Sequence, residues 1–123
     1  MLSFSPTLQV FMAVEPVDLR KGFDGLSAAV EAVFGRHVLD GHLFLFLNRR
    51  RDRIKILWWD RDGLAVFCKR LERGSYEVPR HERDAKQLRL DATQLSLLLD
   101  GIQLESAKRR PRYVRAPSCE AAG

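Results

Sequence analysis

Apolar residues recur along the chain with two different periods. Between Arg20 and Phe34 they follow one another at three- and four-residue spacing, and Gly35 comes directly after the last of them. This spacing places the apolar side chains on one face of a helix, with Gly35 as its stop and Asp18 or Asp24 as its N-cap. The sequence therefore predicts a long N-terminal helix.

The centre of the chain has the shorter period of β-strands. Three β-rich runs, His42–Leu47, Arg53–Trp59 and Leu64–Arg70, are separated by the turn sequences NRRRD and DRDG. They predict a three-stranded antiparallel meander with Trp59 opposite Leu64. In that register one face of the sheet carries Ile54, Ile56, Trp58, Ala65 and Phe67, and the other carries Leu57, Trp59, Leu64, Val66 and Cys68.

Shorter elements flank this centre. Gln9–Val14 predicts a strand that Pro16 ends, and Tyr76–Val78 is long enough for a brief pairing. Alternation around Leu88 and Leu90 predicts a last short strand. Asp91 and Gln94 have the spacing of a capping box. An amphipathic helix follows, with Leu95, Leu98, Leu99 and Ile102 on one face and Gly101 at its end.

These elements predict an α+β fold. A small antiparallel sheet, centred on the three-stranded meander, is packed by the long N-terminal helix on one face and by the short C-terminal helix over another part. The length of 123 residues suits one core, and we assign residues 1–104 to a single domain. Residues 105–123 are basic and rich in small side chains, which predicts a flexible basic tail.

Positive charge is concentrated in the middle of the chain. The formal net charge is +5, and residues 48–83 alone carry eleven basic and six acidic side chains. A local excess of this kind attracts an anionic partner, and nucleic acid is the leading candidate. The alternative is that arginine and lysine keep hairpin tips and strand edges solvated.

The sequence does not predict an enzyme. His37, in a turn, and His42, at the start of a strand, suit ordinary surface roles, and Cys68 suits a small core residue. A metal-dependent nuclease using Asp60, Asp62 or Glu72 is a distant alternative, because the DRDG turn already accounts for both aspartates. No cofactor motif or zinc spacing is present.

The expected location in the cell follows from the N-terminal residues, the length of the apolar stretches and the number of cysteines. The first ten residues have no basic segment ahead of their apolar residues, and no apolar stretch is long enough to cross a membrane. Two cysteines are too few for a disulfide framework. We therefore expect a cytoplasmic protein without membrane partners.

A nucleic-acid surface is the best-supported binding site. An antiparallel ribbon with an arginine-rich tip can lie against duplex DNA, and arginine binds phosphate through two parallel hydrogen bonds. The predicted DNA-contacting residues are Arg49, Arg50, Arg51, Arg53, Lys55, Lys69 and Arg70. Trp58 is assigned to the core, whereas Leu57 and Trp59 are candidates for a protein-interaction surface.

Six segments of the chain share their residues and order with one known family. They are Asp18–Gly22 (DLRKG), Asp24–Leu26 (DGL), Gly41–Phe46 (GHLFLF), Asn48–Leu57 (NRRRDRIKIL), Trp59–Gly63 (WDRDG) and Lys69–Gly74 (KRLERG). In these segments the chain resembles the small accessory proteins of the insertion sequence 66 family, the products of its second open reading frame (TnpB). The resemblance runs from about Pro16 to Pro79 and resumes at Leu95–Gly101. Trp58 and Val78 depart from it, replacing a common tyrosine and a frequent tryptophan.

The resemblance implies a role in DNA transposition beside a larger transposase of the same element, which carries the strand-transfer chemistry. The expected function is that of a non-catalytic accessory protein that binds the ends of the element, the transposase or a companion accessory protein. The alternative is a protein-interaction module without direct DNA contact. An unrelated RNA-guided nuclease shares the TnpB name, but this chain is too short for it and lacks its zinc-ligand cysteine pairs.

Overall fold

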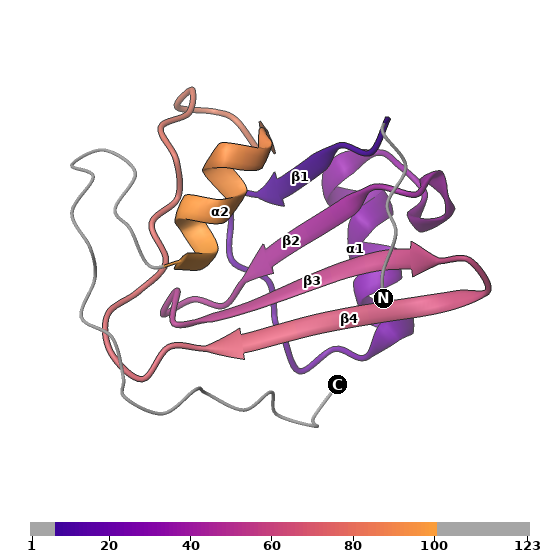
Figure 1. Ribbon diagram of the computed structural model, residues 1–123, viewed down its shortest axis with the longest axis horizontal. Coiled ribbons are helices and arrows are strands. Elements are labelled where there is room, and N and C mark those ends of the chain that lie inside the picture. The colour runs from indigo at the N-terminus through magenta and orange to yellow at the C-terminus, as the bar shows by residue number, and fades with distance from the viewer. Residues whose placement is uncertain (1–6, 101–123) are drawn as a thin grey trace.

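The computed structural model describes residues 7–100, which form five strands and two α-helices (Figure 1). In chain order the elements are β1 (Val10–Ala13), α1 (Phe23–Phe34), the short 3-10 helix η1 (Val38–Asp40), β2 (Leu43–Leu47), β3 (Arg53–Asp60), β4 (Gly63–Arg70), β5 (Gln87–Leu90) and α2 (Ala92–Asp100). The fold class is α+β, as the sequence predicts. The predicted tail at 105–123 lies outside the described residues.

All five strands belong to one mixed sheet in the order β4-β3-β2-β1-β5. The prediction of an antiparallel sheet centred on a three-stranded meander was wrong, because β2, β3 and β4 make up only one side of this sheet. Its centre is β2, which pairs in parallel with β1 from Val10↔Leu43 to Met12↔Leu45. Parallel neighbours need a long crossover, and α1 with η1 supplies it.

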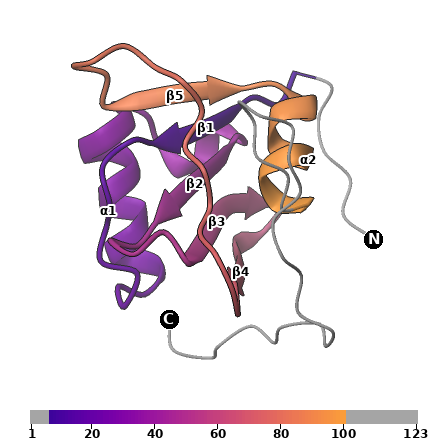
Figure 2. The same ribbon diagram turned by 90° about the vertical axis from the view of Figure 1, so that its left-hand side faces the viewer.

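The two helices cover opposite faces of the sheet (Figure 2). α1 packs its buried residues Leu26, Val30 and Phe34 against Phe44 and other apolar side chains of β1, β2 and β3. α2 buries Leu98 on the other face, where Trp58 also lies. Trp59 is opposite Leu64 and the alternation follows the prediction, so Trp58 is confirmed as a core residue.

The ends of the helices follow local sequence signals in part. α1 begins at Phe23, not Arg20, and spans twelve residues after β1, so the long N-terminal helix was wrong. Its N-cap is Gly22, which has no side chain to cap with, rather than Asp18 or Asp24. Gly35 ends it at φ 62°, as predicted.

Two further predictions concern the second half of the chain. Asp91 and Gln94 form the predicted capping box at the start of α2, with backbone-to-side-chain bonds of 2.9 and 2.7 Å. Tyr76–Val78 forms no strand. The predicted end of α2, at Gly101 and Ile102, lies outside the described residues.

Candidate nucleic-acid interface

The hairpin that joins β2 to β3 carries most of the predicted DNA-contacting residues, and its shape is fixed by hydrogen bonds of Asn48. The Asn48 side-chain amide donates to Asp52 Oδ1 at 2.7 Å, and Asn48 Oδ1 accepts from the Arg53 backbone at 3.0 Å. The Arg51 backbone N–H donates to the Asn48 carbonyl at 3.1 Å. Arg51 itself lies in the left-handed region at φ 59°. The polar residues therefore shape the turn, and Arg49, Arg50 and Arg51 are exposed.

A second segment braces this hairpin from behind. The Tyr76 backbone N–H donates to the Arg51 carbonyl at 2.6 Å, and the Leu71 N–H donates to the Asp52 carbonyl at 2.7 Å. Tyr76 is only 1% exposed and packs in the core below α2. Because one end of the brace is anchored in the core, the arginine tip is held in place although it is exposed.

A cavity of about 530 Å³ lies between the hairpin and the loop that follows β1. The Val17 N–H donates to the Leu47 carbonyl at 2.9 Å and fixes the loop beside the hairpin. The cavity is lined by Pro16, Val17, Asp18, Leu19, Arg20, Asn48, Arg49, Arg50, Asp52 and Arg53. The DLRKG and NRRRDR segments, far apart in the chain, thus meet around one space.

Asp18 and Arg20 form a two-armed ion pair in this loop. Arg20 Nε donates to Asp18 Oδ1 and Arg20 Nη2 donates to Oδ2, both at 3.1 Å. The Arg20 backbone N–H also donates to Oδ1, at 3.0 Å. These hydrogen bonds from Arg20 lower the pKa of Asp18 from 3.8 to about 2. The Asp18 carboxylate is therefore ionised and already neutralised by its neighbour at physiological pH.

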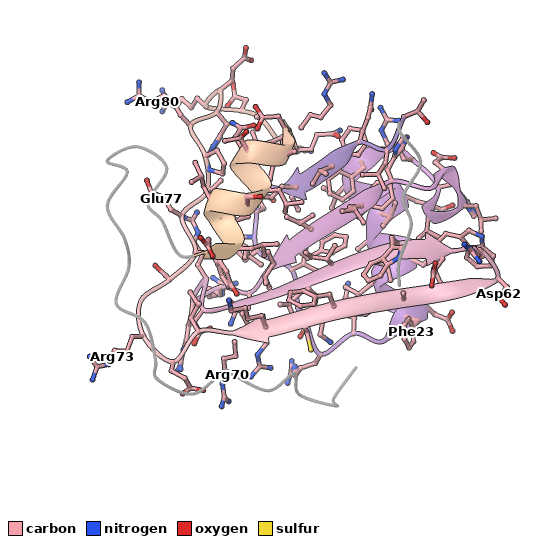
Figure 3. The ribbon with its side chains drawn as sticks, in the orientation of Figure 1. Phe23, Asp62, Arg70, Arg73, Glu77 and Arg80 are labelled. Atoms are coloured by element: carbon pink, nitrogen blue, oxygen red, sulfur yellow. The ribbon has the colours of Figure 1, made fainter. Side chains whose placement is uncertain are left out.

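Arg70 extends the positive surface along the sheet. It lies directly opposite Arg53 in the β3–β4 ladder, where like charges repel each other. Arg70 Nη2 reaches Glu72 Oε1 at 3.5 Å, and both side chains are partly solvated. Arg70 and Arg73 project from the same end of the molecule (Figure 3). Positive charge is therefore concentrated at this end of the β3–β4 ladder.

The two lysines predicted to contact DNA lie away from the exposed arginine tip. Lys55 is only 3% exposed, because it lies between its ladder partners Phe46 and Cys68 on the face covered by α1. Lys69 projects from the opposite face, and its Nζ donates to the Leu99 carbonyl at 3.2 Å in the last turn of α2. Assigning Lys55 to a phosphate contact was wrong, and Lys69 binds the end of a helix instead.

The two predicted protein-interaction residues, Leu57 and Trp59, differ in their exposure. Leu57 is 0% exposed and packs beneath α1, so its assignment to a surface was wrong. Trp59 is half-buried near the DRDG turn. Figure 3 shows Phe23 and Asp62 on this side of the molecule, away from Arg70 and Arg73. Among the described residues three large apolar side chains are exposed, Phe23 at 49%, Leu39 at 54% and Phe67 at 41%.

The residues that were considered for catalysis have separate structural roles and do not gather at one place. His42 Nδ1 accepts from the Gln9 N–H at 3.0 Å, and His37 caps η1. Cys68 is buried in the core at 8% exposure, as predicted, and it is disulfide-bonded. Within residues 7–100 no three His, Cys, Asp or Glu side chains gather as a metal site would require. In the same range no helix is long and apolar enough to cross a membrane.

Comparison with known proteins identifies the family. The family model of the IS66 Orf2 like protein matches residues 8–109. The chain belongs to this IS66 Orf2-like family. Its members are accessory proteins of IS66 insertion sequences, which associates this chain with transposition.

Two proteins similar to the chain come from Sinorhizobium fredii. The chain is 37% identical to the uncharacterized protein y4hO over 102 residues, which cover 83% of this chain and 87% of y4hO. It is 32% identical to the uncharacterized protein y4jC over 111 residues, which cover 90% and 93% of the two chains. No solved structure matches the chain.

Arg20 was not among the predicted DNA-contacting residues. Arg20 was assigned to the start of a helix, whereas it lies in the loop and lines the cavity with Arg49, Arg50 and Arg53. Nothing in the local spacing places this loop beside a hairpin almost thirty residues later. The only sequence signal was that both segments belong to the motifs shared with the family.

Proposed function

We propose that this IS66 Orf2-like protein acts in transposition as a non-catalytic DNA-binding factor in the cytoplasm, working beside the transposase of its element. The observation that supports this proposal is the braced hairpin tip. Arg49, Arg50 and Arg51 are exposed there, and Arg53 and Arg70 continue the positive surface along the sheet. Five arginines on a rigid ribbon match the repeated phosphates of a duplex.

Rigidity of the tip favours binding. A flexible basic loop loses conformational entropy when it binds, whereas the bonds from Tyr76 and Leu71 already hold this hairpin. Arginine is also the residue that binds phosphate through two parallel hydrogen bonds. We assign Lys55 and Lys69 no part in this contact because of their positions.

A fluorescence anisotropy titration tests the proposal. The protein is titrated against a labelled duplex from the element end and a scrambled duplex of equal length, at several salt concentrations. We expect tighter binding to the element end and affinity that falls steeply with salt. Equal affinities would leave only a nonspecific electrostatic contact, and no binding at low salt would refute direct DNA contact.

A matched pair of triple variants locates the contact. Arg49, Arg50 and Arg51 are replaced by alanine in one variant, and the exposed Arg61, Arg83 and Arg89 in the other, so that both lose three charges. Only the hairpin variant should bind more weakly to all sequences, with a salt slope shallower by about 0.9 for each lost phosphate contact. An equal loss in both variants would indicate general attraction rather than a site.

A second candidate is a module that binds the transposase or a companion accessory protein without touching DNA. It is favoured by exposed apolar side chains, Phe23 at the start of α1 and Phe67 on the opposite face of the sheet, where it lies across from Ile56. Copurification with the transposase that survives nuclease treatment would support it. Phe67→Ser should then weaken copurification, whereas the hairpin triple variant should leave it unchanged.

A further inference from the structure

The cavity beside the hairpin joins an apolar wall to a charged one. Pro16, Val17 and Leu19 come from the loop, and Arg49, Arg50 and Arg53 come from the hairpin. Its volume of about 530 Å³ lies within the range of about 300–1,000 Å³ that is typical of small-molecule sites. A space of this size has room for one nucleotide and not for a length of duplex.

The charges that line the cavity do not cancel. Four arginines face two aspartates, which leaves a net of two positive charges. Asp18 is already occupied by Arg20 through two hydrogen bonds, and Asp52 accepts a hydrogen bond from the Asn48 amide. The Asn48 amide is neutral, so Asp52 keeps its charge, and the excess of two positive charges lies on the hairpin side, where Arg49, Arg50 and Arg53 outnumber Asp52.

We propose that this cavity binds a terminal phosphate monoester with its nucleoside, as found at the end of a nucleic-acid strand. The inference rests on the proposed function and names the part of the DNA that the cavity receives. A phosphate monoester carries about −1.5 to −2 charges at pH 7, which matches the net charge of the cavity, whereas an internal phosphodiester carries one. The apolar wall suits the sugar and base, and the arginines suit the phosphate oxygens.

The test uses oligonucleotides that differ only at one end. Duplexes with a short single-stranded overhang carry a 5′-phosphate, a 3′-phosphate or hydroxyl groups only, and each is titrated by anisotropy. We expect one phosphorylated form to bind at least about tenfold more tightly than the hydroxyl form. Equal, salt-dependent binding of all three would overturn the cavity proposal and leave the DNA-binding proposal standing.

A competition experiment with free ligands distinguishes a nucleotide site from a site for phosphate alone. A nucleoside monophosphate is added as competitor, and inorganic phosphate serves as its comparison. Loss of the preference for the phosphorylated end with nucleotide, but not with equal inorganic phosphate, supports a nucleotide site. If no duplex binds, the proposed function fails, and direct titration with the nucleotide decides the cavity: binding supports it and no binding overturns it.

Charge variants at the loop give an independent check. Arg20→Gln leaves the Asp18 carboxylate without its ion-pair partner and removes one positive charge, so the preference for the phosphorylated end should largely disappear. Asp18→Asn combined with Arg20→Gln returns the net charge to its original value and should restore the preference to within about twofold. If the double variant prefers the phosphorylated end as little as Arg20→Gln does, the proposal that Arg49, Arg50 and Arg53 bind the phosphate while Asp18 and Arg20 neutralise each other is overturned. Arg61→Gln, outside the cavity, is the control and should retain the full preference.

Discussion

Arg51 and Arg61 have the same left-handed backbone conformation, at φ 59° and 58°, in the turns at the two ends of β3. Both side chains are exposed, so the two arginines differ mainly in their neighbours. Arg51 lies among the other arginines of the braced hairpin. Arg61 lies between Asp60 and Asp62.

This relationship provides a matched test of the DNA surface. Asparagine tolerates the left-handed region, so Arg51→Asn and Arg61→Asn remove the same charge without adding different strain. We expect Arg51→Asn to reduce the salt slope of DNA binding by about 0.9, and Arg61→Asn to leave it unchanged. Anisotropy at four salt concentrations measures both slopes. Equal slopes for the two variants would remove the tip from the interface.

Tyr76 should be essential for stability because it is buried and its backbone braces the tip. Tyr76→Ala removes a large core side chain and should lower the free energy of unfolding by about 3–5 kcal/mol. Tyr76→Phe keeps the ring, loses the long 3.5 Å bond from Oη to the Lys69 carbonyl, and should cost less than about 1 kcal/mol. Urea denaturation compares the two variants. A large loss in Tyr76→Phe would show that the hydroxyl, not the ring, carries the contribution.

The Asp18–Arg20 pair predicts a specific dependence on pH. The pKa of Asp18 is lowered from 3.8 to about 2 by hydrogen bonds from Arg20. Because the folded-state pKa is the lower one, the pair stabilises the fold above about pH 4, and this contribution is lost as pH falls toward 2. An NMR titration of the Asp18 carboxyl should have its midpoint near 2, and Arg20→Gln should return it toward 3.8. A midpoint that is the same in both proteins would contradict the pair in solution.

Lys69 should contribute to stability rather than to DNA binding. Its Nζ donates to the Leu99 carbonyl in the last turn of α2, where positive charge is favourable. Lys69→Met keeps the apolar stem but loses this bond, and we expect it to cost about 0.5–1.5 kcal/mol. The affinity for DNA should change no more than in Lys86→Met, an exposed control on another strand boundary. A loss of affinity specific to Lys69→Met would return this lysine to the interface.

Local patterns in the sequence predicted the features that depend on neighbouring residues. The DRDG turn sets Trp59 opposite Leu64, and the Asp91–Gln94 spacing forms the cap of α2. The pairing of β1 with β2 and β5 was not predictable in this way, because its partners are separated by long stretches of chain. No short-range signal specifies which distant strand lies beside which.

The errors at Lys55 and Leu57 have a common cause. Alternation along Arg53–Trp59 shows which residues share a face, but it identifies the solvated face only when the other face is the core. Here α1 covers one face of β3 and the side chains around α2 cover the other, so neither face of the middle of β3 is solvated. The arginine tip was predictable because it is a turn, and the cavity was not because half of it comes from the loop after β1.

The position of β1 in the sheet has a consequence for how the chain matures on the ribosome. β1 is the first strand to be synthesised, yet both of its neighbours come later, β2 after α1 and β5 only at Gln87–Leu90. The edge of β1 that faces β2 is paired only after a crossover of nearly thirty residues has been made. The edge that faces β5 stays unpaired until the last strand emerges. Until then, the edge of Val10–Ala13 that faces β5 has no partner strand. Completion of this sheet is therefore a late event of translation. A chain that ends before Leu90 has an unpaired edge on β1 that can associate with other chains.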